Sequence, residues 1–335
     1  MIARRTLLGG LAATATASHA AAQQREKPDQ SSLPVPPGYV ATECTFVEDW
    51  AGNALSPFWH DYITSNAANG WPWNYDGKTG SGMGNQKNAE YYVPTQLAVK
   101  NGMLEITEIK QPINGIAQGA PFTFLCTSGV ICSYGRMEFR GGQLQISMKQ
   151  SSGSGVWNSL WMMVGSHAGA GYGDRWEIDI QEGGFLDGLP VESAPRNLAW
   201  HLYSQGTWRG GIVDGKVNLS DDFHTYGIDW DPGQHVSWYF DGNETARLTR
   251  SQCPIPDVPM HVIISHQMGN ASTSGWHTTL SDATPQEMVM QVKRLELYQH
   301  SGSGLWLHPD AAASRGRKPS EPMSKRQPTI QKKIK

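Results

Sequence analysis

The sequence predicts an all-β protein, an antiparallel β-sandwich of jelly-roll type. Three observations predict this fold class. Short runs of alternating apolar and polar residues recur along the chain, separated by Gly, Asn or Asp, as in strands joined by turns. No run of about 12 residues has the apolar spacing of an amphipathic helix. No repeat of about 20–50 residues is found, which argues against a solenoid or a propeller.

The expected strands alternate as in a sheet with one buried face. The turn sequence Asp241-Gly242-Asn243 directly follows one of them and predicts a tight hairpin. Because β-sandwiches commonly reach about 200–250 residues as one unit, we expect a single folded body over residues 41–300. The expected strands are Met103–Ile109, Gly135–Arg140, Gln143–Met148, Trp176–Ile180, His235–Phe240, His261–Ser265 and Gln291–Tyr298.

The N-terminal residues 1–22 are typical of an export signal. Arg4 and Arg5 precede a weakly apolar segment, and three alanines at 20–22 offer small residues for a signal peptidase. The segment resembles a twin-arginine signal, and the alternative is an ordinary secretory signal. Both alternatives predict a secreted or periplasmic protein.

Two further segments differ in composition from the body. Residues 23–40 are polar and rich in proline, which predicts a linker. Residues 301–335 hold eight Lys or Arg and two acidic residues, which predicts a basic disordered tail; the alternative is a segment that binds an anionic partner.

Charge and hydropathy exclude several classes of partner. The chain carries −3 overall, and because its two ends carry +2 and +6, the body carries −11. Such an acidic body argues against a nucleic-acid partner. No apolar run reaches about 18 residues, so we expect no membrane span, and we expect a monomer.

Four cysteines, Cys44, Cys126, Cys132 and Cys253, would face an oxidising compartment after export. Cys126 and Cys132 are close enough in sequence to close a short loop, but three pairings are open. No Cys or His cluster has zinc spacing, so we expect no metal and no cofactor.

Three acids lie close together in one expected strand. Glu177 and Asp179 share one face, because successive side chains of a strand point to opposite faces. Glu182 would fall on the other face unless one extra residue is inserted. A β-bulge around Ile180-Gln181 would supply that residue and return Glu182 to the face of the other two acids.

Three neighbouring carboxylates repel one another, so at least one should hold a proton near neutral pH and act as a general acid. Retaining glycoside cleavage needs two carboxyl groups about 5–5.5 Å apart, which Glu177 and Glu182 can supply. Asp179 would hydrogen-bond to the nucleophile. The alternative is that the acids only mark a solvated strand face.

The acidic segment and its surroundings resemble glycoside hydrolase family 16, the laminarinase and agarase-like group of endoglycanases. The resemblance spans roughly Phe46 to Gln299 and implies a concanavalin A-like fold with an open substrate cleft. The acid spacing is similar to that of the family's bulged branch. The matching motifs are Asn88-Ala-Glu90-Tyr-Tyr92, Tyr134-Gly-Arg136-Met-Glu138, Gly155-Val-Trp157-Asn-Ser-Leu-Trp161, Glu177-Ile-Asp-Ile-Gln-Glu182 and Trp238-Tyr-Phe-Asp241-Gly242.

The resemblance implies that residues 41–300 form the catalytic domain. It implies that Glu177 is the nucleophile, Asp179 the assisting carboxylate and Glu182 the acid/base. It places His201 near the leaving-group side of the cleaved bond; the alternative is a packed strand histidine.

The resemblance also implies the sugar-binding residues. Trp157 and Trp161 would stack on sugars on the non-reducing side, although both can also be core aromatics. Asn88, Glu90 and Arg136 would form the polar floor of the same cleft. The alternatives are surface strand residues for the first two and, for Arg136, an ion pair with Glu138 or Asp174.

Several positions leave the substrate open. The chain has Asn158-Ser159 where the family usually has Pro-Ala, Gln181 where it has Met, and a different stretch at His266–Asn270. An additional segment holds Trp71, Trp73 and Tyr75, which form either a stacking platform or a local aromatic cluster.

Three functions follow from these residues. The first is a secreted retaining endo-β-glycanase acting on a polysaccharide, with β-1,3- or mixed β-1,3/1,4-glucan ahead of agar-type galactans. The second is a transglycosylase at the same site. The third is a non-catalytic lectin, which would have no need for both Glu177 and Glu182.

Overall fold

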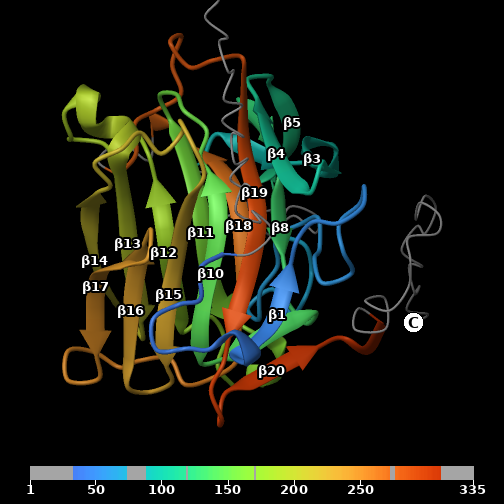
Figure 1. Cartoon of the computed structure of the whole chain (residues 1–335). Coiled ribbons are helices and arrows are strands. Elements are labelled where there is room, and N and C mark those ends of the chain that lie inside the picture. The colour runs from blue at the N-terminus through green and yellow to red at the C-terminus, as the bar shows by residue number, and fades with distance from the viewer. Residues whose placement is uncertain (1–32, 74–87, 118–119, 170, 272–275, 311–335) are drawn as a thin grey trace, which may run out of the picture. The chain divides into compact units, whose positions relative to one another are not determined.

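The computed structural model describes residues 33–73, 88–117, 120–169, 171–271 and 276–310. They all belong to one compact unit, Leu33–Lys335. Two large β-sheets, mainly antiparallel, lie face to face in this unit, and a two-stranded sheet lies beside them (Figure 1). The all-β sandwich predicted from the alternation is confirmed.

The first sheet has ten strands in the described residues. β1 (Cys44–Glu48) pairs with β19, and β3 (Leu97–Lys100) pairs with β4, off the main path. The main path runs β17 (Asn243–Thr249), β16 (His235–Phe240), β15 (His224–Asp231), β10 (Gly142–Lys149), β19 (Glu287–Tyr298), β4 (Met103–Ile109), β7 (Cys126–Ser128) and β2 (Glu90–Tyr92).

The second sheet has eight strands in the same described ranges and carries the acids. β8 (Val130–Cys132) pairs with β18, off the main path. The main path runs β14 (Thr207–Asp214), β13 (Asn197–Ser204), β12 (Trp176–Gly183), β11 (Val156–Val164), β18 (Met260–Met268), β9 (Met137–Arg140) and β20 (Gly304–Leu307).

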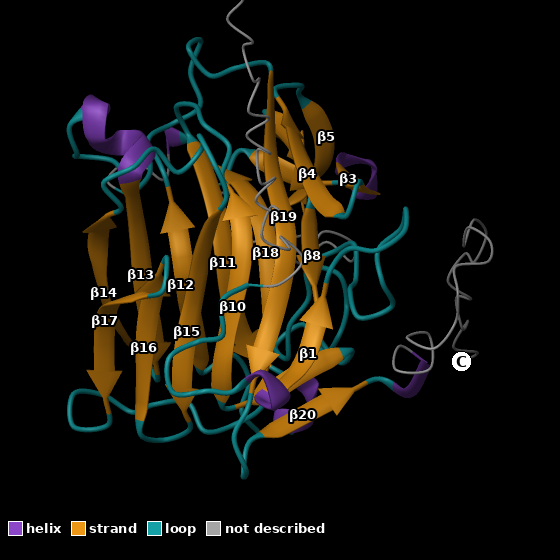
Figure 2. Cartoon of the chain, viewed as in Figure 1, coloured by secondary structure: helices purple, strands orange, loops and turns teal. Residues whose placement is uncertain are grey.

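The remaining elements are short. β5 (Ile113–Ala117) and β6 (Ala120–Phe124) form the small sheet. In the connections that the structure describes lie the 3₁₀ helices η1 (Ala41–Glu43), η2 (Pro94–Gln96), η3 (Ser166–Ala168) and η4 (Val191–Arg196). Figure 2 shows how little of the chain is helical. Among the described residues, no helix has the length and apolar character needed to cross a membrane.

The core lies between the two large sheets. Ile146 and Ile228 of the first sheet and Ile178 and Val262 of the second are fully buried in one cluster. Burying each such side chain stabilises the fold by about 1.5–3 kcal/mol. Because every second residue of β12 is committed to this core, the alternate residues must point to the opposite face.

The hairpin predicted at Asp241-Gly242 is confirmed. These two residues join β16 to β17 with φ angles of 47° and 77°. Positive φ at both central positions defines the turn type whose twist matches that of the flanking strands. The turn therefore fixes the register of this edge of the first sheet.

The N-terminal boundary differs from the predicted linker. Residues Leu33–Val40 lie on the outer face of the first sheet, where Gln145 Nε2 donates to Pro34 O at 3.0 Å and Tyr39 OH donates to Asp229 Oδ1 at 2.9 Å. A proline-rich segment shows no alternation of apolar and polar residues. The packing of Leu33–Val40 on the sheet could therefore not be predicted from the sequence. The predicted export signal lies outside the described residues.

The C-terminal boundary is also shifted. The predicted tail begins at Ser301, but β20 (Gly304–Leu307) pairs with β9 in the second sheet. The folded unit thus continues past the predicted end, because a four-residue edge strand is too short to show alternation. The basic residues from Arg315 onward lie outside the described residues.

All four cysteines are free thiols. Cys126 lies in the first sheet and donates to Glu108 Oε1 at 2.9 Å, whereas Cys132 lies in the second and donates to Thr64 O at 3.4 Å. The short loop considered between Cys126 and Cys132 is not closed, because the two strands belong to different sheets.

Candidate active site

β12 contains the bulge that the acid spacing predicted. On its β11 side, Trp161 pairs with Asp179 and Leu160 with Gln181, so Ile180 has no opposite residue. The β13 side shows a register shift over the same stretch, between Asp179 and Glu182. The extra residue brings Glu182 to the face that carries Asp179.

Buried polar groups support the bulge from the core side. Gln181 accepts from Gln150 Nε2 at 2.9 Å and donates to Asn158 O at 3.0 Å. A Cβ on Gly183 would lie 2.1 Å from Gln150 Nε2, so glycine leaves the space that Gln150 needs. The indole of Trp238, from the opposite sheet, donates to Asp179 O at 2.8 Å.

The carboxylate of Glu182 is held from two neighbouring strands. Trp157 Nε1 on β11 donates to its Oε1 at 2.9 Å, and His201 Nδ1 on β13 lies 2.7 Å from its Oε2. His201 Nδ1 also lies 3.8 Å from Asp179 Oδ2. Two hydrogen bonds from opposite sides fix the direction in which Glu182 points.

The other two acids are hydrogen-bonded to each other, and both have a raised pKa. Burial raises the pKa of Glu177 to about 8, with a further contribution from the charge of Glu182. Burial, followed by the charges of Glu182 and Glu177, raises the pKa of Asp179 well above its usual range. Their hydrogen bond raises the pKa of Asp179 and lowers that of Glu177, so Asp179 is the donor in this bond.

Asp179, Glu182 and His201 offer ligand atoms within 4.8 Å of one another. Their close approach also follows from hydrogen bonding, since Glu182 and His201 are in direct contact. A protonated carboxyl and hydrogen-bonded neighbours suit proton transfer, whereas metal binding requires deprotonated ligands. We keep the prediction that the protein uses no metal and no cofactor.

The ring of His201 lies over β14. A Cβ on Gly210, the residue paired with His201, would lie 2.0 Å from His201 Cδ2. Glycine at 210 thus makes room for the imidazole that holds Glu182. Gly210 was not among the predicted site residues, although a glycine inside a strand is a signal for close approach of another group.

Trp157 is near the acids but not open to a sugar. Its exposed fraction is 6%, and its ring stacks on His277 with centroids 4.3 Å apart and planes 14° apart. Its contact with Glu182 makes it a positioning residue, so the predicted sugar stacking differs from what the ring does here. His277 comes from a distant segment and left no signal in the sequence.

Trp161 is a core aromatic of the second sheet. It is 3% exposed, donates to Ser265 Oγ at 3.0 Å and packs in a cluster that includes Ile63 and Ile263. The interpretation of Trp161 as a core aromatic therefore matches the structure better than a role in stacking on a sugar.

Asn88 and Glu90 are fully buried, which fits neither an open floor nor a surface strand. Asn88 Nδ2 donates to Gln267 Oε1 at 2.7 Å, and the Met268 amide donates to Glu90 Oε2 at 2.9 Å. Burial raises the pKa of Glu90 to about 8. The pair supports β18 from within, two strands away from β12.

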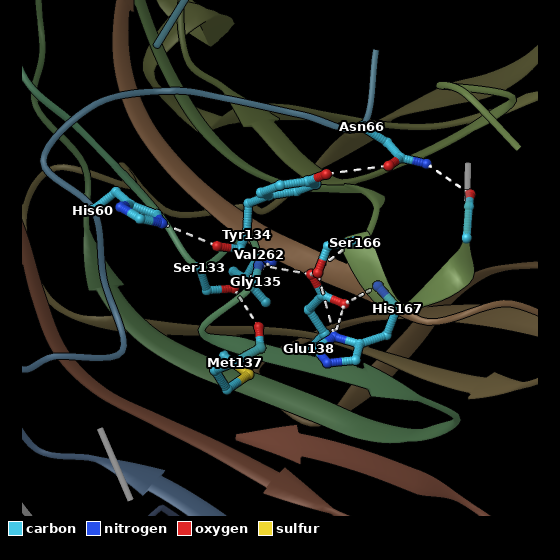
Figure 3. A network of polar contacts seen from close by, with 11 residues as sticks. His60, Asn66, Ser133, Tyr134, Gly135, Met137, Glu138, Ser166, His167 and Val262 are labelled. Atoms are coloured by element: carbon cyan, nitrogen blue, oxygen red, sulfur yellow. Dashed lines mark hydrogen bonds and ion pairs between the residues drawn. The ribbon is translucent and has the colours of Figure 1, made fainter. Parts of the chain in front are cut away.

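Arg136 lies away from the acids. It donates to the ring of His60 at 3.1 Å and to Pro57 O at 2.8 Å, beside a cavity of about 270 Å³. Glu138 is instead held by Ser166 and His167 (Figure 3). β11 and β18 separate this region from β12, so the predicted floor is not assembled here.

Trp71 and Trp73, in the additional segment, differ in exposure. Trp71 is 55% exposed, whereas Trp73 is only partly buried and packs against the cluster that contains Trp161. Tyr75 lies outside the described residues. The stacking platform predicted for this segment stays a prediction.

Comparisons with known proteins agree with this geometry. The model of the family Glycosyl hydrolases family 16 matches residues 59–288. The chain is 27% identical over 238 residues to a beta-glucanase of Rhodothermus marinus, covering 67% of this chain and 78% of that protein. It is 24% identical over 273 residues to glucan endo-1,3-beta-glucosidase A1 of Niallia circulans, covering 73% of this chain and 38% of that longer protein.

A solved structure shares the fold. The laminarinase catalytic domain from Thermotoga maritima MSB8 superposes with a TM-score of 0.60 at 24% identity, covering 77% of this chain and 98% of that one. The family model alone matches more than half of the chain. The chain therefore belongs to glycoside hydrolase family 16, and it is a glycoside hydrolase.

Proposed function

We propose that the protein is a secreted retaining endo-β-glycanase that hydrolyses β-1,3- or mixed β-1,3/1,4-glucan. The observation that carries the proposal is the bulge of β12. It places Glu182, held by Trp157 and His201, on the same face as Glu177 and Asp179.

In the first half of the reaction, Glu177 attacks the anomeric carbon, and Glu182 protonates the departing glycosidic oxygen. Glu177 must be ionised for the attack. The hydrogen bond from Asp179 favours that ionised form, while burial and the charge of Glu182 oppose it. The product is a glycosyl ester on Glu177.

In the second half, Glu182 takes a proton from a water that attacks the same carbon, and Glu177 leaves as a carboxylate. His201 and Trp157 keep Glu182 aimed at the bond during both halves. Two inversions at one carbon give net retention of configuration.

The substrate class is proposed from the relatives. The proteins of Rhodothermus marinus and Niallia circulans are a beta-glucanase and a glucan endo-1,3-beta-glucosidase. Agar-type galactans are the next class to test. The chain departs from the family pattern at Asn158-Ser159, Gln181 and His266–Asn270, and such cleft positions are expected to select the sugar.

The test is release of reducing sugar by the purified protein from laminarin, lichenan and agarose. The control is Glu177→Gln, which keeps the size of the side chain and removes the nucleophile. We expect cleavage of laminarin or lichenan that the variant loses by at least about 10³-fold. Cleavage that persists in the variant, or polysaccharide binding without cleavage, contradicts the proposal.

A further inference from the structure

The face that carries the acids continues across two strands as a row of aromatic rings. In the cross-strand register, Glu177 on β12 lies opposite Tyr203 on β13, and Tyr203 lies opposite Trp208 on β14. Neighbouring strands are about 4.8 Å apart, so the row extends roughly 10 Å from the proposed nucleophile.

Trp208 is unusually open for a large aromatic residue, with 50% of its surface exposed. Its indole is braced by neighbouring rings, with centroids 4.9 Å from Tyr203 and 6.0 Å from the edge-on ring of His201. These contacts restrict the ring without burying it. An exposed, braced aromatic beside a reaction centre suits stacking on the apolar face of a ligand ring.

Tyr203 also lines an open cavity of about 680 Å³ at the end of the same strands. Tyr172, 36% exposed, lines it too, together with the polar residues Asp174, Arg175 and Gln205. The Asp174 carboxylate accepts from Ser65 Oγ at 2.8 Å, which fixes its position. Aromatic walls with polar groups, one of them a fixed carboxylate, match the apolar faces and hydroxyls of a saccharide.

The two strands that flank β12 differ in how far their aromatic residues are exposed. On the β11 side, Trp157 and Trp161 are 6% and 3% exposed. On the β13 side, Trp208 is 50% exposed, and Tyr203, which its ring contacts, lines the cavity. The family resemblance puts His201 near the leaving-group side, and His201 contacts Glu182 from β13, so β13 and β14 lie toward the leaving part of the chain.

We propose that Trp208 and Tyr203 form a stacking platform for the sugars on the leaving side of the cleaved bond, and that the adjacent cavity receives the next part of that saccharide. This inference rests on the proposed endo-β-glycanase function. Trp208 is then a specificity-determining residue that favours long substrates over short ones.

The experiment compares two kinds of substrate in Trp208→Ala and Trp208→Phe. Unmodified β-1,3-gluco-oligosaccharides and laminarin place sugars on the leaving side, whereas aryl β-glycosides of the same oligosaccharides place only an aryl group there. Tyr239→Ala is the matched control, because it removes an aromatic ring from the first sheet, on the other side of the core.

For Trp208→Ala we expect kcat/KM on the unmodified substrates to fall about 3- to 10-fold, mainly through KM. We expect the aryl glycosides to change less than twofold and Trp208→Phe to retain part of the rate. An equal loss on both kinds of substrate, or no loss on either, overturns the inference.

A binding measurement separates this inference from the proposed function. Calorimetry with Glu177→Gln and with the double variant Glu177→Gln/Trp208→Ala uses oligosaccharides of laminarin, lichenan and agarose. If the wild type cleaves none of these polymers, the endo-β-glycanase proposal fails. Weaker saccharide binding by the double variant still supports the platform, whereas equal binding, or no binding to either, overturns it.

Discussion

At the scale of residues, the site depends on how Glu177 and Glu182 influence each other. The charge of Glu182 adds to the effect of burial and raises the pKa of Glu177 to about 8. A carboxyl with a raised pKa is protonated below that value, so the ionised form of Glu177 that the proposed mechanism requires is lost as the pH falls. The acidic limb of kcat/KM should therefore reflect ionisation of Glu177.

Glu182→Gln should move that limb to lower pH, because the substitution removes a negative charge that opposes ionisation of Glu177. The measurement is a pH profile on an aryl glycoside whose leaving group needs no proton. Wild-type protein on the same substrate is the control. A limb that stays in place or moves to higher pH would show that the two carboxylates are not coupled.

Gly210 offers a second residue-scale test. A methyl group at this position would lie 2.0 Å from His201 Cδ2, so Gly210→Ala should displace the imidazole from Glu182. We expect kcat to fall about 10- to 100-fold, because Glu182 loses the hydrogen bond that fixes its direction.

Gly211→Ala is the matched control for this test. It changes the neighbouring glycine of the same strand, whose Cβ would meet the ring of Trp200 at 3.0 Å on the other face. If both variants lose activity equally, the effect belongs to β14 and not to His201.

At the scale of elements, the sequence was most informative where alternation is strict. The apolar residues of β12 predicted which face is buried, and the spacing of the acids then required a bulge, which both neighbouring strands confirm. The sugar-binding residues were less predictable. Trp157 is buried by His277, more than 100 positions away, and no local pattern encodes that contact.

The segment Leu33–Val40 is an element that the sequence did not predict. Tyr39 anchors it by donating to Asp229 at 2.9 Å and by stacking on His300 with centroids 4.0 Å apart. Tyr39→Phe keeps the ring and removes the hydrogen bond to a charged acceptor. We expect the free energy of unfolding to fall by about 1–2 kcal/mol.

Urea denaturation measures this change, with Val35→Ala as the control because Val35 is 43% exposed in the same segment. A Tyr39→Phe variant as stable as the wild type would mean that the segment contributes little to the fold.

At the scale of the whole molecule, the fold class and the position of the three acids on one face of β12 could be predicted, whereas both boundaries of the folded unit could not. β20 and Leu33–Val40 are short. β20 depends on pairing with β9, and Leu33–Val40 depends on side-chain hydrogen bonds to the first sheet, so their own sequences carry little information. The acids were predictable because their chemistry requires a fixed spacing on one strand.

Export is the prediction that concerns the entire chain. Arg4→Lys combined with Arg5→Lys keeps the charge of the N-terminus but removes the arginine pair. In a bacterial host with a twin-arginine pathway, we expect the protein to stay in the cytoplasm, as measured by fractionation and immunoblotting. Unchanged export would favour the ordinary secretory signal.

The most direct test of Glu177 as the nucleophile is to trap the glycosyl-enzyme. A 2-deoxy-2-fluoro laminari-oligosaccharide with an activated leaving group slows release of the covalent sugar, and mass spectrometry of the digested protein locates it. We predict one sugar ester on Glu177. A label on Glu182, or products of inverted configuration without any label, would contradict the assignment of these two carboxyl groups.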